Sequence, residues 1–172
     1  MGLSDLFKKN QNADEMEVSA ADVDPDDVVF PVYDAILEKS HYGDRGDRAE
    51  KLNPHERVIL VVRLVEDEVN NGGFSQFIYN TSGNYAGDVV ASMTAIGAVK
   101  TAEICQRALS AFGTEIPMDR KARQALLEQK EEEGIGEILD ECDDAFYAYE
   151  EDLIRLCCAY ILAHKDAFDL CE

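Results

Sequence analysis

Residues 68–83 read EVNNGGFSQFIYNTSG and join the end of one apolar segment to the beginning of the next. Gly72 and Gly73 supply the positive-φ conformations that commonly end a helix. Phe74, Phe77 and Ile78 then return apolar side chains toward the same core. This stretch, the corner motif, is expected to turn the chain between two packed segments. A second turn is expected at its end, within residues 80–83, where polar side chains can bond backbone groups that a broken helix leaves unpaired.

The segment before the corner motif has the pattern of an amphipathic helix. Asn53 is a favourable N-cap residue, and Pro54 suits the first helical position because its missing N–H has no partner there in any case. Valines then recur at three- and four-residue spacing, which predicts one core-facing side. They are Val58, Val61, Val62, Val65 and Val69.

This helix, the pattern NNGGFxQFxYNxxG and the sequence that follows resemble an acidic bacterial family, long called a domain of unknown function, whose characterised member is a DNA-mimic protein. The resemblance extends from about Val28 to the C-terminus. It implies an all-helical fold. In the mimic, a carboxylate-covered surface occupies the DNA-binding face of a helix-turn-helix transcription factor. The residues of the pattern look structural, so function has to be argued from the charges.

Composition bounds the class of protein and of partner. The chain has 172 residues, of which 46% are hydrophobic, enough for one domain with a buried core. Its net charge is -20 and its pI is near 4.3. Such an acidic chain is not expected to bind nucleic acid or an anionic membrane directly, whereas basic proteins are natural partners. We expect an acidic, partly mobile arm over residues 1–23 and a single compact all-α multi-helix domain over residues 24–172.

Cysteine usage and the absence of targeting signals predict a cytoplasmic protein. The five cysteines are odd in number and form no CxxC pair, which is typical of reduced, buried thiols. The first residues, MGLSDLFKKN, contain neither a secretory apolar core nor a myristoylation signal. No apolar run is long enough to span a membrane.

The final third of the chain carries the strongest charge pattern. Residues 128–152 contain twelve carboxylates and one cation, Lys130, and so hold -11 of the net charge. Apolar residues recur at alternating three- and four-residue steps, which predicts one helix running toward His164 with a carboxylate stripe opposite the apolar side. These apolar residues are Leu139, Cys142, Phe146, Tyr149, Leu153, Leu156 and Tyr160.

The missing cations favour a functional reading of this stripe. Solvated helix faces usually alternate Glu with Lys, and like charges at that spacing slightly oppose folding. A single helix of this length would extend about 37 Å, with roughly one net charge per 3.4 Å, the density of one DNA strand. Gly134 and Gly136 are candidate breaks in it, so the comparison concerns charge density and not exact register. The leading hypothesis is therefore a decoy that binds a basic DNA-binding protein by charge mimicry. The candidate partner-binding residues are Glu128, Glu131, Glu132, Glu133, Glu137, Asp140, Glu141, Asp143, Asp144, Glu151 and Asp152.

Other functions have weaker support in the sequence. An immunity-type protein that neutralises a different basic partner is the second hypothesis, and an uncharacterised enzyme is the third. His41, His55 and His164 are isolated from the cysteines and from one another, so no catalytic or metal-binding group is predicted from them. Asp140 and Asp143 belong to an acidic group without the spacing or glycine of a calcium-binding loop. No catalytic residue, cofactor motif or metal site is predicted.

Overall fold

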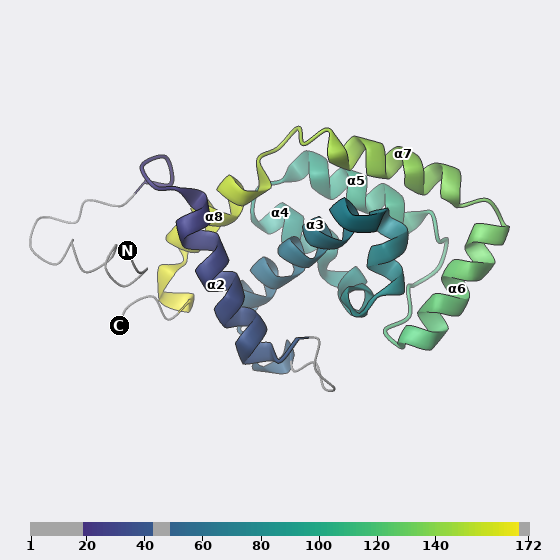
Figure 1. Cartoon of the computed structure of the whole chain (residues 1–172), viewed down its shortest axis with the longest axis horizontal. Helices are drawn as coiled ribbons and strands as arrows, with labels where there is room; N and C mark the ends of the chain where they lie inside the picture. The colour runs from purple at the N-terminus through teal and green to yellow at the C-terminus, as the bar shows by residue number, and fades with distance from the viewer. Residues whose placement is uncertain (1–18, 43–48, 169–172) are drawn as a thin grey trace, which may run out of the picture. The chain divides into compact units, whose positions relative to one another are not determined.

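The computed structural model describes residues 19–42 and 49–168 (Figure 1). These ranges contain seven α-helices, three short 3₁₀ helices and no strand, which confirms the all-α prediction. No helix within them is long and apolar enough to cross a membrane. The chain divides into two compact units, residues 1–60 with 152–172 and residues 61–151. Most of the expected N-terminal arm lies outside the described residues, so its predicted boundary at residue 23 stays a prediction.

The first unit is built on two helices that pack together, α2 (Pro25–Ser40) and α8 (Leu153–Ala163). Asp24 caps α2, because its carboxylate accepts a hydrogen bond from the Asp26 amide at 3.1 Å. Pro25 is the first helical residue, where its missing N–H needs no partner. The buried apolar residues of the two helices include Val28, Val32, Ile36, Leu153, Cys157 and Ile161.

Helix α3 (Pro54–Tyr79) begins in the first unit and continues into the second. The Asn53 side chain accepts hydrogen bonds from the His55 and Glu56 amides at 2.9 and 3.0 Å. The Glu56 carboxylate accepts one from the Asn53 amide at 2.8 Å and pairs with Lys39 at 2.8 Å. These reciprocal bonds form a capping box and confirm the helix start predicted from the sequence.

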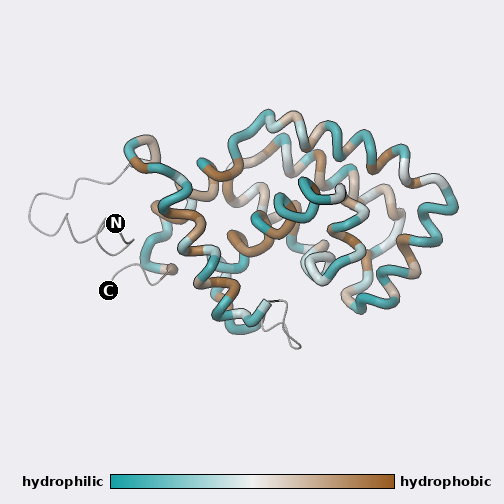
Figure 2. Tube along the Cα trace, viewed as in Figure 1, coloured by the Kyte–Doolittle hydropathy of each residue, from teal (hydrophilic) through white to brown (hydrophobic). Residues whose placement is uncertain are grey.

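The second unit continues α3 and adds a 3₁₀ helix (Thr81–Asp88), α4 (Val89–Ala95), α5 (Val99–Ser110), α6 (Arg120–Glu132) and α7 (Gly136–Tyr147). Helix α5 packs against α4 and α7, and α6 packs against the 3₁₀ helix. Apolar and polar residues alternate along α7, so one side of it can be buried (Figure 2). The buried core includes Val65, Phe74, Phe77, Met93, Cys105, Leu139, Cys142 and Phe146.

The predicted single helix over the final third is wrong. Helix α6 ends at Glu132, and Gly134 follows with φ 92°. Helix α7 ends at Tyr147, and Tyr149 adopts a φ of 46° before α8 begins. The apolar spacing continues across this second break, so periodicity could not reveal it. Tyr149 is held out of helical geometry by a tertiary bond, since its hydroxyl donates to Glu66 at 2.9 Å.

Candidate acidic interface

The corner motif is held together by one carboxylate. Glu68 accepts hydrogen bonds from Gln76 at 2.7 Å, from Asn80 at 2.9 Å and from the Ser82 hydroxyl at 2.9 Å. Three donors that follow the break at Gly72 and Gly73 therefore converge on one side chain that precedes it. Hydrogen bonds to an ionised acceptor are stronger than neutral ones, so Glu68 fixes the turn rather than offering a free charge.

The break inside α3 requires glycine at residue 73. Gly73 has φ 72°, and a β-carbon there would meet the Asp143 carboxylate at 2.1 Å. That carboxylate accepts a hydrogen bond from the Phe74 amide at 2.8 Å and so caps the second part of α3 from another helix. Burial raises the pKa of Asp143 despite this bond, and the neighbouring carboxylates Asp140 and Asp144 add to the rise. One of the predicted interface carboxylates therefore has a structural task.

A buried arginine anchors α6 to the same turn. The side chain of Arg123 is fully buried, and its guanidinium donates to the carbonyls of Ile78, Asn80, Pro117 and Met118 at 2.6 to 2.9 Å. The close approach explains Gly83, where a β-carbon would lie 2.4 Å from the Arg123 Nε. Arg123 thus binds backbone groups that the turn leaves without helical partners.

Tyrosines attach the C-terminal end of α7 to α3. The Tyr147 hydroxyl donates to the Val69 carbonyl at 2.8 Å, and Tyr149 bonds to Glu66. Glu66 also pairs with Arg63, which in turn reaches Asp67 at 3.1 Å. The sequence indicated apolar packing for Tyr149 and gave no signal for this polar attachment, because the partners are about eighty residues apart in the chain.

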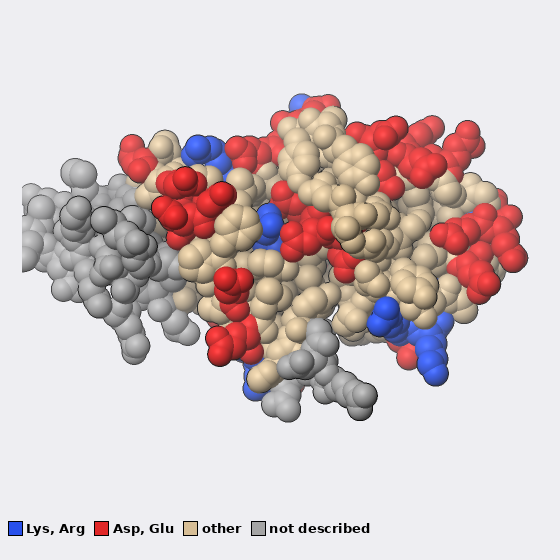
Figure 3. Space-filling model, in the orientation of Figure 1, with Lys and Arg blue, Asp and Glu red and all other residues tan. Residues whose placement is uncertain are grey.

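Most predicted interface residues lie on the surface of α6 and α7. Figure 3 shows carboxylates covering α7 and the C-terminal half of α6, whereas basic side chains lie at the other end of α6. Of the eleven predicted residues, only Asp143 and Glu151 are partly buried; the others are exposed. Asp152 belongs to the first unit, where it caps α8 by accepting from the Arg155 amide at 3.1 Å. The other ten belong to the second unit.

Several of the exposed carboxylates are already paired. Glu133 binds Lys130 at 2.7 Å, and hydrogen bonds from Lys130 and Gln129 lower its pKa. Glu141 pairs with Arg107 of α5. Such surface pairs are worth little in stability, but they reduce the charge offered to a partner.

Glu151 caps α5 from outside the helix. Its two oxygens accept from the Lys100 amide at 3.1 Å and from the Thr101 amide at 2.8 Å. Burial opposes ionisation of Glu151, but these hydrogen bonds outweigh it and lower the pKa. A carboxylate at the N-terminus of a helix also interacts favourably with the helix dipole. We therefore place Glu151 with the structural carboxylates.

Six of the predicted residues, which we call the free set, are exposed and make no ion pair or hydrogen bond with another side chain of the described ranges. They are Glu128, Glu131, Glu132, Glu137, Asp140 and Asp144. The remaining five, the engaged set, are Glu133, Glu141, Asp143, Glu151 and Asp152. The sequence pattern indicated the surface position correctly for nine of the eleven but could not separate the two sets.

The helix breaks change the charge spacing expected from the sequence. Helix α7 has 12 residues, or about 18 Å of axis. Its three members of the free set therefore give roughly one uncompensated charge per 6 Å, against about 3.4 Å for one strand of DNA. The comparison with a continuous 37 Å rod no longer applies, and α6 has to contribute the remaining charge.

Two histidines expected to be isolated lie together in the first unit. The rings of His55 and His164 stack with centroids 4.3 Å apart, and His55 also contacts the Tyr160 hydroxyl at 2.8 Å. The two residues are far apart in sequence, and α3 and α8 bring them together. Within the described ranges, no group of three or more His, Cys, Asp or Glu side chains is placed to hold a metal ion. Burial raises the pKa of Cys105 to about 12, as expected for a packed thiol.

Comparison with known proteins gives one match. Neither a curated protein nor a solved structure matches this chain. A family model described as DMP19-like protein matches residues 50–164, which include the corner motif, helices α6 and α7 and the attachments described above. Since the match covers more than half of the sequence, the chain belongs to the DMP19-like protein family.

Proposed function

We propose that this protein binds the DNA-binding surface of a basic protein by charge mimicry of DNA and thereby blocks its access to DNA. The observation that carries the proposal is the free set, six carboxylates held on α6 and α7 with no cation of the described ranges to neutralise them. A DNA-binding protein presents Lys and Arg at positions that contact phosphates, and fixed carboxylates offer the same side chains an alternative.

The helices give these charges a defined position. Leu139, Cys142 and Phe146 of α7 are buried on the side opposite its free carboxylates, and Leu127 of α6 is also buried. Arg123 anchors the beginning of α6, and the tyrosine bonds anchor the end of α7. Ordered charges lose less conformational entropy on binding than a flexible acidic tail would, which favours a specific complex.

The family supports the same proposal. The corner motif resembles that of a family whose characterised member is a DNA mimic, directed at a helix-turn-helix transcription factor. Because several motif residues have structural tasks in this chain, the motif itself carries the fold, and the free set carries the proposed activity. We propose a helix-turn-helix transcription factor as the partner and a role in transcription regulation, as a cytoplasmic inhibitor without catalytic activity.

The proposal is tested in two stages. DNA-binding proteins are captured on the full chain from a native lysate at low salt, and each is then mixed with its own DNA site in a gel-shift assay. Added wild-type protein should release the DNA, less effectively as salt is raised, because the contact between charges is screened.

The variants separate mimicry from net charge. E137K/D140K/D144K should abolish release of the DNA. The variant D27K/D34K/E38K places the same charge change on exposed residues of α2 and should still release it. If every captured protein stays on its DNA in the presence of the wild type, the mimicry proposal fails.

A further inference from the structure

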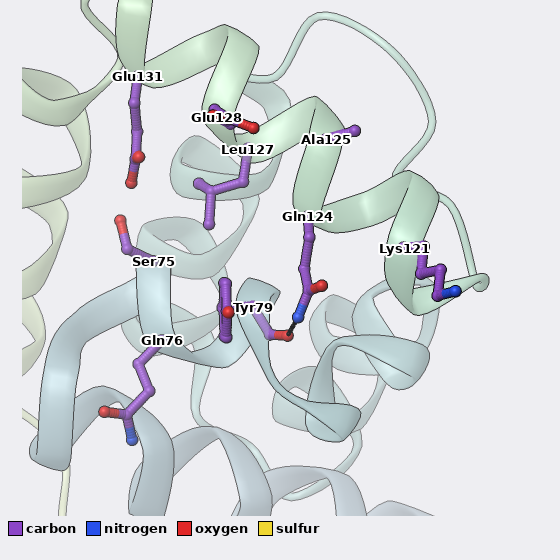
Figure 4. A pocket seen from close by; sticks show the side chains of 9 residues that line it. All are labelled: Ser75, Gln76, Tyr79, Lys121, Gln124, Ala125, Leu127, Glu128 and Glu131. Carbon is purple, nitrogen blue, oxygen red and sulfur yellow. Dashed lines mark hydrogen bonds between the residues drawn. The ribbon is translucent and has the colours of Figure 1, made fainter.

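The second unit contains a groove between the end of α3 and α6 (Figure 4). Its volume is about 750 Å³, within the range of roughly 300–1,000 Å³ that is common for small-ligand sites. Tyr79 and Leu127 contribute apolar surface, and Ser75, Gln76 and Gln124 contribute polar groups. The groove is thus large enough to receive a side chain of a partner, which a flat acidic surface is not.

The two ends of the groove differ in charge. Glu131 points toward Ser75 at one end, and Glu128 lies near it, one helical turn earlier on α6 (Figure 4). Lys121 lies at the other end. A cation entering the groove is therefore attracted to the glutamate end and repelled from the lysine end, which gives the site a direction.

The glutamates of the groove can bind a partner, whereas the side-chain amides that line it already donate hydrogen bonds within the unit. Glu128 and Glu131 belong to the free set. Gln124 donates to the Tyr79 carbonyl at 3.1 Å, and Gln76 donates to Glu68 at 2.7 Å. The walls are thus fixed to each other and to the corner motif, while the two carboxylates have no partner among the described side chains.

The Tyr79 ring provides a surface for a planar cation. Its side chain is 51% exposed although it belongs to the corner motif. The Arg120 guanidinium lies 5.8 Å from the ring centroid, so this ring already has one cation against it. Arginine stacks on aromatic rings and matches carboxylates with its planar donors, which a lysine ammonium cannot do.

We infer that the groove between α3 and α6 receives an arginine side chain of the basic partner, stacked on Tyr79 and paired with Glu128 and Glu131. This inference rests on the proposed function and adds a discriminating contact to it. Members of the free set on α7 attract basic surfaces in general, whereas the groove selects partners that present an arginine at the matching position.

The test uses the full ¹⁵N-labelled chain and two probes, tetra-arginine amide and tetra-lysine amide, followed by NMR. Tetra-arginine should shift the signals of Tyr79 and Gln124 with saturation, and tetra-lysine should bind about threefold or more weakly. E128Q/E131Q should weaken tetra-arginine binding about tenfold, and Y79L about threefold. D27N/D34N removes two exposed charges of α2, which belong neither to the groove nor to the free set, and should change the affinity for tetra-arginine less than about twofold.

The inference would be overturned by equal affinity for the two probes, by equal losses of affinity in E128Q/E131Q and D27N/D34N, or by shifts that map outside the groove. The gel-shift assay distinguishes this failure from failure of the proposed function. If E128Q/E131Q releases DNA as well as the wild type, the groove is not the arginine site although mimicry holds. If tetra-arginine binds in the groove but no DNA-binding protein is displaced, the proposed function fails and the groove remains a cation site.

Discussion

Helices α6 and α7 are both amphipathic and carry carboxylates of the same acidic segment, but the structure uses their charges differently. On α7, Asp143 caps α3 and Glu141 pairs with α5, so part of the charge is used inside the unit. On α6, the buried charge is Arg123, a cation, and the glutamates in the last turns mostly face solvent. Charged residues thus either form bonds within the unit or face solvent. The number of charges alone does not show which of the two a residue does.

The difference follows from what each helix touches. Helix α7 packs against α5 and lies beside the break in α3, where unpaired amides need acceptors. Helix α6 contacts the turn after α3, where unpaired carbonyls need donors, and Arg123 supplies them. Carboxylates that contact no unpaired amide face solvent. Variants of the structural charges should therefore change stability, and variants of the free set should change binding.

The largest effect on stability is expected at Arg123. Arg123→Met leaves four backbone carbonyls without their donor, and each buried unpaired group costs about 1–3 kcal/mol. We expect the free energy of unfolding to fall by more than about 3 kcal/mol, measured by urea denaturation. Lys121→Met, on the exposed side of the same helix, should change it by less than about 0.5 kcal/mol. Equal effects of the two substitutions would contradict the structural role of Arg123.

The next largest effect is expected at Gly73. Gly73→Ala places a β-carbon against the Asp143 carboxylate at a residue with φ 72°. Strain at such a position costs of order 1–3 kcal/mol, and displacement of Asp143 adds the loss of a cap. Gly87→Ala is the matched control, since nothing lies within 4 Å of its added β-carbon. Thermal unfolding should separate the two variants by several degrees, and coincident curves would contradict the packing described for Gly73.

Asp143 should show a smaller, pH-dependent effect. Asp143→Ala removes the cap of Phe74 and should cost about 1 kcal/mol at pH 7. Asp143→Asn keeps an acceptor oxygen without the buried charge and should be as stable as the wild type or slightly more stable there. Because the pKa of Asp143 is raised above 3.8 in the folded state, its contribution is greatest below pH 3.8 and is lost as pH rises through the folded pKa.

The pH dependence gives the test of Asp143 a direction. As pH is lowered toward 4, the wild type should gain stability relative to Asp143→Asn, measured by urea denaturation at each pH. A gain by the asparagine variant on acidification would mean that the native state favours the ionised carboxylate. That result would contradict the burial described for Asp143.

The smallest effect on stability is expected for the free set. E128Q/E131Q/E132Q removes like charges that repel one another on α6 and leaves its buried side unchanged. The free energy of unfolding should stay within about 0.5 kcal/mol of the wild type or rise slightly. Differential scanning calorimetry at low salt is the most sensitive check. A loss above 1 kcal/mol would show that these glutamates have structural partners.

Local patterns predicted the fold well, and tertiary contacts account for the errors. The cap at Asn53 and the corner at Gly72 and Gly73 follow from residue preferences and were confirmed, although Gly73 has a positive φ and Gly72 does not. The break at Tyr149 was missed because a bond to Glu66, distant in sequence, overrides an unbroken apolar period.

The candidate site was predictable as a region but not residue by residue. Exposure follows from helical periodicity, so most predicted carboxylates lie on the surface. Whether a carboxylate is occupied depends on its neighbours in space. Asp143 and Glu151 cap helices that the sequence could not place beside them. The groove at Tyr79 was also missed, because an aromatic residue in an apolar motif is usually buried.

The central claim is that the free set, and not total negative charge, displaces DNA. The measurement is the concentration needed to release DNA from a captured DNA-binding protein, for two variants that each lose four charges. E131Q/E137Q/D140N/D144N changes the free set, and E133Q/E141Q/E151Q/D152N changes the engaged set. We predict that the first needs at least about tenfold more protein than the wild type, and the second less than about threefold. Equal losses in the two variants would contradict the account.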